Sequence, residues 1–87
     1  MSIIDIMTER LAALDPTRME LIDDSPKHAG HASTGGGYFR LEIVSPRFAD
    51  LATIARHRLV YDALGDLMGG EIHALSITAR TPIEHTN

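Results

Sequence analysis

Apolar residues recur at the three- and four-residue spacing of an amphipathic helix in two segments, residues 2–14 and residues 53–68. Ser2, followed three residues later by Asp5, matches the pattern of a helix N-cap. Gly69-Gly70 follows the second segment, as glycine commonly does after the last turn of a helix. The pattern therefore predicts two helices. The predicted apolar stripe of the second helix consists of Ile54, Val60, Ala63, Leu64, Leu67 and Met68.

Apolar and polar residues alternate in three further segments, residues 17–24, 38–45 and 72–79, which predicts three strands. Met19 and Leu21 face one way in the first strand, and its polar residues face the other. A turn or short helix over residues 45–51 gives the order α-β-β-α-α-β. We expect an α+β fold in which helices cover one face of a three-stranded mixed sheet, with strands one and two antiparallel and strands two and three parallel.

Residues 25–37 show no periodicity and are rich in glycine and small polar residues, so they predict a long loop. Loops beyond about 12 residues in a compact domain are usually functional or disordered. This one carries His28 and His31. As a zinc motif the pair is weak, because the chain has no cysteine and no compact third and fourth ligand. A solvated polar loop is the alternative.

The length of 87 residues fits a single domain over residues 1–87, with a short polar tail over 83–87. The net charge of −4 lacks the basic excess typical of nucleic-acid-binding surfaces. No segment matches a signal peptide or a membrane span, and the absence of cysteine fits a cytoplasmic protein. A thiol nucleophile and a nucleophile elbow are both absent from the sequence, so the enzyme classes that depend on them lack their central residues.

Two histidines lie in a predicted strand or helix, and each has two interpretations. His73 opens the third strand and shares parity with Leu75 and Ile77, which places it on the helix-covered face. It is either a half-buried structural histidine or a ligand held on a rigid edge. His57 lies between Arg56 and Arg58 in the second helix, which indicates either a basic patch for an acidic partner or a solvated helix face.

The segment "RHRLVYDALGDLMGGEIHALSITARTP", residues 56–82, resembles the sequence pattern of the BolA-like proteins. "DDSPKH" (residues 23–28) and "FRLEIVSPRF" (residues 39–48) resemble the family's first strand exit and its second strand. Tyr38 replaces a histidine frequent in the family. The loop has an additional glycine-rich segment with His31, and His85 stands where many members have tryptophan.

This resemblance implies a fold like a type II KH domain and a non-enzymatic role. BolA-like proteins pair with monothiol glutaredoxins and share a [2Fe–2S] cluster with them, to which the partner and its glutathione contribute thiolates. The resemblance implies His73 as one ligand from this chain and His28 as another, with His31 as a competitor. It implies a monomer that forms a heterodimer with the glutaredoxin, and no cofactor in the isolated chain.

Arg56, His57 and Arg58 are the candidate partner surface. The alternative function is a KH-like, nucleic-acid-binding transcriptional regulator of stress response or morphology. Type II KH domains bind single strands through a Gly-x-x-Gly loop, and the corresponding turn here, residues 49–53, has no glycine. The sequence therefore favours cluster sharing over nucleic-acid binding.

Overall fold

The computed structural model describes residues 2–24 and 37–86. All of the predicted loop except Gly37, the first residue of a strand, lies outside the described residues. In chain order the elements are α1 (Ile3–Leu11), the 3-10 turn η1 (Ala12–Leu14), β1 (Arg18–Asp23), β2 (Gly37–Val44), the 3-10 turn η3 (Pro46–Phe48), α2 (Thr53–Leu64), the 3-10 turn η4 (Gly65–Leu67), β3 (Ile72–Arg80) and α3 (Pro82–Thr86).

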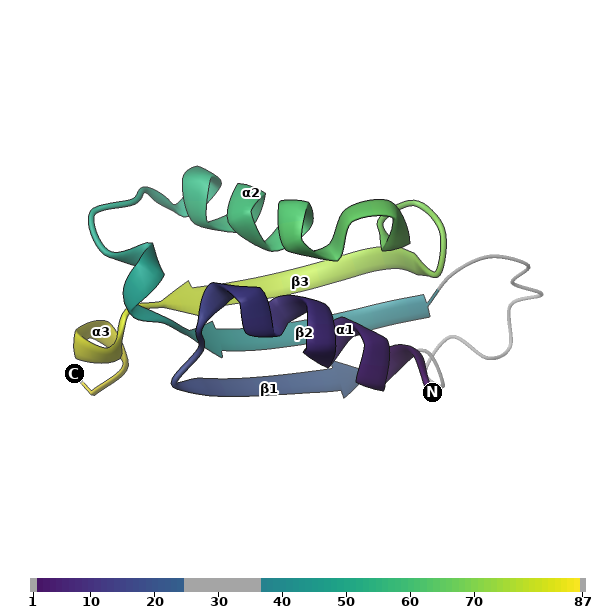
Figure 1. The fold of residues 1–87 in the computed structure, drawn as a ribbon, viewed down its shortest axis with the longest axis horizontal. Helices are drawn as coiled ribbons and strands as arrows, with labels where there is room; N and C mark the ends of the chain where they lie inside the picture. Colours follow the sequence, from purple (N-terminus) through teal and green to yellow (C-terminus); the bar gives the residue numbers. More distant parts are fainter. Residues whose placement is uncertain (1, 25–36, 87) are drawn as a thin grey trace.

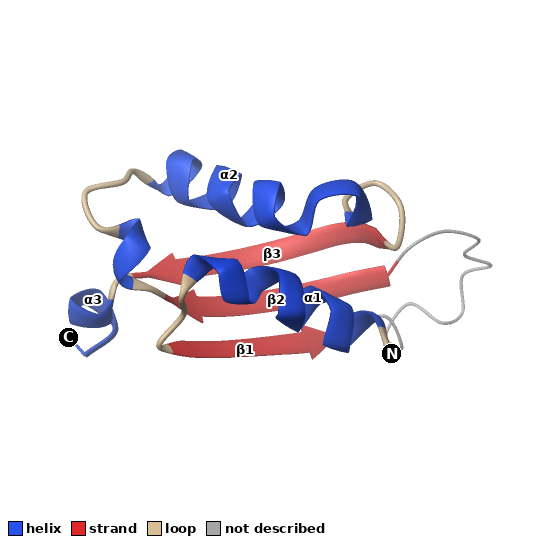
Figure 2. Ribbon diagram, in the orientation of Figure 1, coloured by secondary structure: helices blue, strands red, loops and turns tan. Residues whose placement is uncertain are grey.

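The three strands form one mixed sheet in the order β1-β2-β3, as the sequence predicts (Figure 2). β1 pairs antiparallel with β2, and β2 pairs parallel with β3. Leu41 on β2 stands opposite Leu21 of β1 and Ile77 of β3. Apolar residues of all three strands therefore share one face.

The helices α1 and α2 run along the sheet and pack on this apolar face (Figure 1). The side chains of Phe39, Leu41 and Ile43 on β2 are buried beneath them, so the central strand contributes one side of the core. The other face carries polar pairs, such as Glu42 with Arg80 at 3.6 Å. The prediction of one covered face is confirmed. Helix residues of the buried cluster are Met7, Leu11, Leu14, Phe48, Val60, Leu64 and Leu67.

Both ends of the first helix follow the sequence pattern closely. The Ser2 hydroxyl accepts a hydrogen bond from the Asp5 N–H at 3.2 Å, and the Asp5 carboxylate accepts one from the Ser2 N–H at 3.3 Å. This reciprocal arrangement satisfies two amide groups that have no partner inside the helix. At the other end α1 continues as η1, so the helical segment stops near residue 14 as predicted.

The second helix departs from the prediction in two ways. α2 ends at Leu64, four residues early, because Gly65 adopts φ 59° and the chain continues as the tighter turn η4. Ile54 does not join the buried stripe, since its side chain is 75% exposed. Ile54 and Val60 are six residues apart, which separates them by about 120° around a helix.

The predicted polar tail contains the helix α3, which lies at the end of the sheet where β2 and β3 finish (Figure 1). Thr81 and Glu84 hold its first turn. The Glu84 N–H donates to the Thr81 hydroxyl at 3.2 Å, and the Thr81 N–H donates to the Glu84 carboxylate at 2.9 Å. Of the helices in the described residues, none is long and apolar enough to cross a membrane.

Candidate ligand site around His73

A bulge in the sheet decides the position of His73. Gly37 stands opposite Ile72, but the next residue of β2, Tyr38, stands opposite Ala74. His73 is therefore an additional residue on β3 with no partner position on β2. Bulges bend a strand and redirect a side chain, and they are rare between parallel strands.

The bulge overturns the predicted direction of His73. Ile72 is fully buried in the core, whereas His73 is exposed. Counting back in steps of two from Ile77 and Leu75 predicted the helix-covered face for His73, and the additional residue breaks that count. His73 is thus not a core residue, and its imidazole lies at the protein surface near the start of β3.

The backbone on either side of His73 is fixed by hydrogen bonds. The Gly37 N–H donates to the Glu71 carbonyl at 2.7 Å, and the Gly69 N–H donates to the Ile72 carbonyl at 3.1 Å. Gly69 closes this tight turn with φ 85°, a conformation that glycine adopts without a steric penalty. The side-chain torsions are therefore the main freedom left to the imidazole.

The ring of Tyr38 lies edge-on to the imidazole. The two ring centroids are 5.2 Å apart and the planes meet at 62°. Tyr38 also lines a cleft of about 360 Å³ together with Asp24, Arg40 and Ser76. Tyr38 entered the sequence argument only as a departure from a family pattern. An aromatic residue directly before the inward-facing Phe39 was the available signal.

Arg40 and Asp24 form a forked ion pair at the same cleft. Arg40 Nε donates to Asp24 Oδ2 at 2.6 Å, and Arg40 Nη2 donates to Asp24 Oδ1 at 3.4 Å. Asp24 is the last described residue before the predicted loop. The pair joins the end of β1 to β2, close to Tyr38. His28 and His31, the candidate loop ligands, lie outside the described residues.

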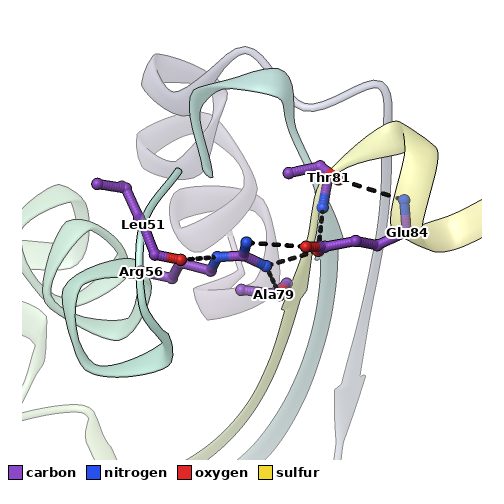
Figure 3. A network of polar contacts seen from close by, with 5 residues as sticks. All are labelled: Leu51, Arg56, Ala79, Thr81 and Glu84. Carbon is purple, nitrogen blue, oxygen red and sulfur yellow. Dashed lines mark hydrogen bonds and ion pairs between the residues drawn. The ribbon is translucent and has the colours of Figure 1, made fainter. Parts of the chain in front are cut away.

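Arg56 of the predicted partner surface turns toward the fold. Its side chain is 13% exposed, and its guanidinium donates to the carbonyls of Leu51 and Ala79 at 2.8 and 3.0 Å (Figure 3). It also binds the Glu84 carboxylate through two hydrogen bonds, of 2.6 and 3.0 Å. Arg56 therefore ties α2 to the end of β3 and to α3.

The Arg56 guanidinium, with help from the Thr81 N–H, lowers the pKa of Glu84 to about 2. The same carboxylate raises the pKa of Arg56. Sequence reasoning missed Glu84, although the spacing of Thr81 and Glu84 matches a capping box. Its pairing with Arg56, 28 positions away in the chain, has no local sequence signal.

His57 and Arg58 remain on the outward side of α2. With Ile54 and Tyr61 they line a groove of about 280 Å³. Tyr61 is 41% exposed, so the groove combines two exposed apolar side chains with a cation and an imidazole. The structure thus divides the predicted surface into an inward Arg56 and an outward pair.

The described residues contain no group of three or more histidine, aspartate or glutamate side chains placed to hold a metal ion. Within these residues the His73 ring contacts Tyr38 and takes part in no hydrogen bond to a protein atom. An exposed imidazole on a fixed backbone can offer one coordination bond to a metal ion.

Comparison with known proteins identifies the family. The model of the BolA-like protein family matches residues 11–84, most of the chain. The chain belongs to the BolA-like family. Its fold is similar to that of BolA1 from Arabidopsis thaliana, with a TM-score of 0.85 and 37% sequence identity over 97% of this chain and 96% of that one.

Two curated relatives extend this family assignment. BolA-like protein 1 of Homo sapiens is 44% identical over 81 residues, which cover 91% of this chain and 57% of that protein. SufE-like protein 1, chloroplastic/mitochondrial, of Arabidopsis thaliana is 45% identical over 78 residues, which cover 82% of this chain and 21% of that protein. The chain therefore spans only part of either relative, and a BolA-like segment occurs within larger proteins.

Proposed function

We propose that this chain is a non-enzymatic partner of monothiol glutaredoxins that shares a [2Fe–2S] cluster with them, in iron–sulfur cluster trafficking or in iron or redox regulation. The observation that carries the proposal is the exposed imidazole of His73 on a hydrogen-bonded bulge. Membership of the BolA-like family supports it.

The donor set of the chain explains why a partner is required. Iron–sulfur clusters are normally held by thiolates, and this chain has no cysteine. Two imidazoles can replace two thiolates on one iron, as in Rieske centres, and this raises the reduction potential. His73 would supply one imidazole and a loop histidine the second, while the glutaredoxin and its glutathione would supply thiolates. The cluster, when bound, provides a transferable or redox-active iron–sulfur unit.

The remaining residues hold and present these ligands. The bulge aims His73 outward, and buried Ile72 fixes the strand directly before it. The outward groove on α2, with His57 and Arg58, offers a polar and apolar contact surface for the partner. Arg56 keeps α2 in place through Glu84 and the carbonyls of Leu51 and Ala79.

Co-expression with a monothiol glutaredoxin tests the proposal. The purified complex is expected to show the visible absorption and circular dichroism of a cluster with mixed thiolate and imidazole ligands, while the chain expressed alone is colourless. His73→Ala should lose the mixed-ligand spectrum. His85→Ala is the matched control, since His85 is an exposed histidine on α3. Identical spectra for the two variants would remove His73 from the ligand set.

The same complex separates the two loop histidines. His28 is four positions beyond Asp24, whereas His31 is seven positions beyond it. Each further residue that has to be ordered costs about 1–2 kcal/mol of backbone entropy. We therefore expect His28→Ala to shorten the lifetime of the cluster more than His31→Ala does. A larger effect of His31→Ala would assign the second position to His31.

A further inference from the structure

The aromatic contact at the bulge has a consequence for how His73 is presented. Because Tyr38 stands opposite Ala74, the additional residue His73 is left beside the tyrosine without a backbone partner position on β2. The flanking hydrogen bonds fix the backbone of His73 but do not fix its ring. Within the described residues, the ring of Tyr38 contacts the ring of His73.

The geometry of the contact restricts the imidazole. Aromatic rings prefer edge-to-face arrangements with centroids 4.5–7 Å apart, and the pair here has 5.2 Å and 62°. Tyr38 is itself half-buried and belongs to the central strand, next to the fully packed Phe39. It is therefore a firm surface against which the exposed and otherwise mobile ring of His73 is held.

We propose that Tyr38 is the positioning residue that orients the His73 imidazole for coordination. This inference rests on the proposed cluster-sharing function. Without the tyrosine ring, the histidine side chain has several rotamers available, and only part of that population presents a ring nitrogen in the direction that the partner-held iron requires. Tyr38 acts through His73 and contributes no ligand itself.

The first test uses the isolated protein and needs no cluster. In proton–carbon-13 correlation NMR spectra recorded at an alkaline pH, the ring protons of His73 are expected to be shifted by the ring current of Tyr38. Tyr38→Phe keeps the aromatic ring and should preserve the shift. Tyr38→Ala should move the His73 signals toward those of exposed His85. Thr78→Ala, an exposed position farther along β3, is the matched control and should change nothing.

The second test uses the glutaredoxin complex and measures the lifetime of the cluster against a chelator. Tyr38→Ala should shorten it by about twofold to tenfold, the range that corresponds to one aromatic pair. Tyr38→Phe should stay close to wild type. Unchanged His73 ring shifts in Tyr38→Ala, or an unchanged lifetime in that variant while His73→Ala shortens it, overturns the positioning role alone. An unchanged spectrum in His73→Ala overturns the ligand role, and the positioning role with it.

Discussion

The two ends of β3 use their polar side chains in opposite ways. Where the strand finishes, Arg56 and Glu84 join α2, β3 and α3, and the guanidinium donates four hydrogen bonds (Figure 3). Where the strand begins, the His73 side chain is exposed, and within the described residues its ring contacts the ring of Tyr38. One end is closed by a satisfied polar network, and the other presents a polar group outward.

The difference shows how a small fold combines stability with an accessible histidine side chain. At the end where β3 finishes, the polar groups of Arg56 and Glu84 hold the elements together. At the His73 end this task belongs to the buried side chain of Ile72 and to backbone hydrogen bonds around the bulge. We therefore expect the imidazole to contribute little to folding, and it is accessible at the surface. Single substitutions at the two ends test this division.

The largest effect is expected for Ile72→Ala. Ile72 is completely buried, and truncating a buried isoleucine costs about 2–5 kcal/mol through lost burial and the cavity that remains. The free energy of unfolding, measured by chemical denaturation, should fall by that amount. A loss below about 1 kcal/mol would mean that the core does not fix the strand beside His73.

Arg56→Ala should be next in size. The substitution removes every bond in which the guanidinium links α2 to α3, and hydrogen bonds of charged groups contribute about 1.5–3 kcal/mol. We expect a loss of about 1–3 kcal/mol in the free energy of unfolding. Arg58→Ala, at the exposed position two residues on, is the control and should be close to neutral. Equal losses in the two variants would contradict the structural role of Arg56.

Low pH should weaken the Arg56–Glu84 network at the end of β3. The pKa of Glu84 is lowered from 4.5 to about 2, chiefly by the hydrogen bond from Arg56. The ionised carboxylate therefore stabilises the fold fully above about pH 4.5, and this contribution is lost as the pH falls toward 2. The stability difference between wild type and Glu84→Gln should shrink over that range. In an Arg56→Ala background the pH dependence of this difference should largely disappear.

His73→Ala should have the smallest effect on folding. The side chain is exposed, and the substitution removes only the ring contact with Tyr38, so the free energy of unfolding should fall by at most about 1 kcal/mol. Comparison with its neighbour Ile72→Ala is the sharpest form of the contrast. Similar losses in the two variants would place His73 among the structural residues.

Periodicity in the sequence predicts much of this fold. The alternation around Leu41 and the helical spacing around Leu64 reflect burial on one face, so the mixed sheet with one covered face follows from local patterns. The direction of His73 does not follow, because one additional residue reverses the parity of a strand and leaves no mark in composition. Ile54 is assigned to the wrong face when residues six positions apart are counted on one stripe.

Contacts between distant residues account for the other differences. The ring contact of Tyr38 with His73 depends on the register of two parallel strands. The Arg56–Glu84 pair depends on where α3 lies, and a helix of five residues gives little periodic signal. Thr81 and Glu84 did carry a local sign of helix formation through their capping spacing. The position of His73 at the start of its strand left a structural role and a ligand role open, and the resemblance to the BolA-like family is what implied the ligand role.

The most direct test of the central claim is pulsed electron paramagnetic resonance on the reduced complex with a monothiol glutaredoxin, formed with this chain labelled with nitrogen-15 histidine. Iron-bound imidazole nitrogens give strong hyperfine couplings, which distinguish them from histidines that only lie nearby. We predict two strongly coupled nitrogen-15 nuclei in the wild-type complex, one from His73 and one from a loop histidine; His73→Ala should lose one of them, and His85→Ala should keep both. The absence of any strongly coupled nitrogen-15, or couplings unchanged by His73→Ala, would contradict the account.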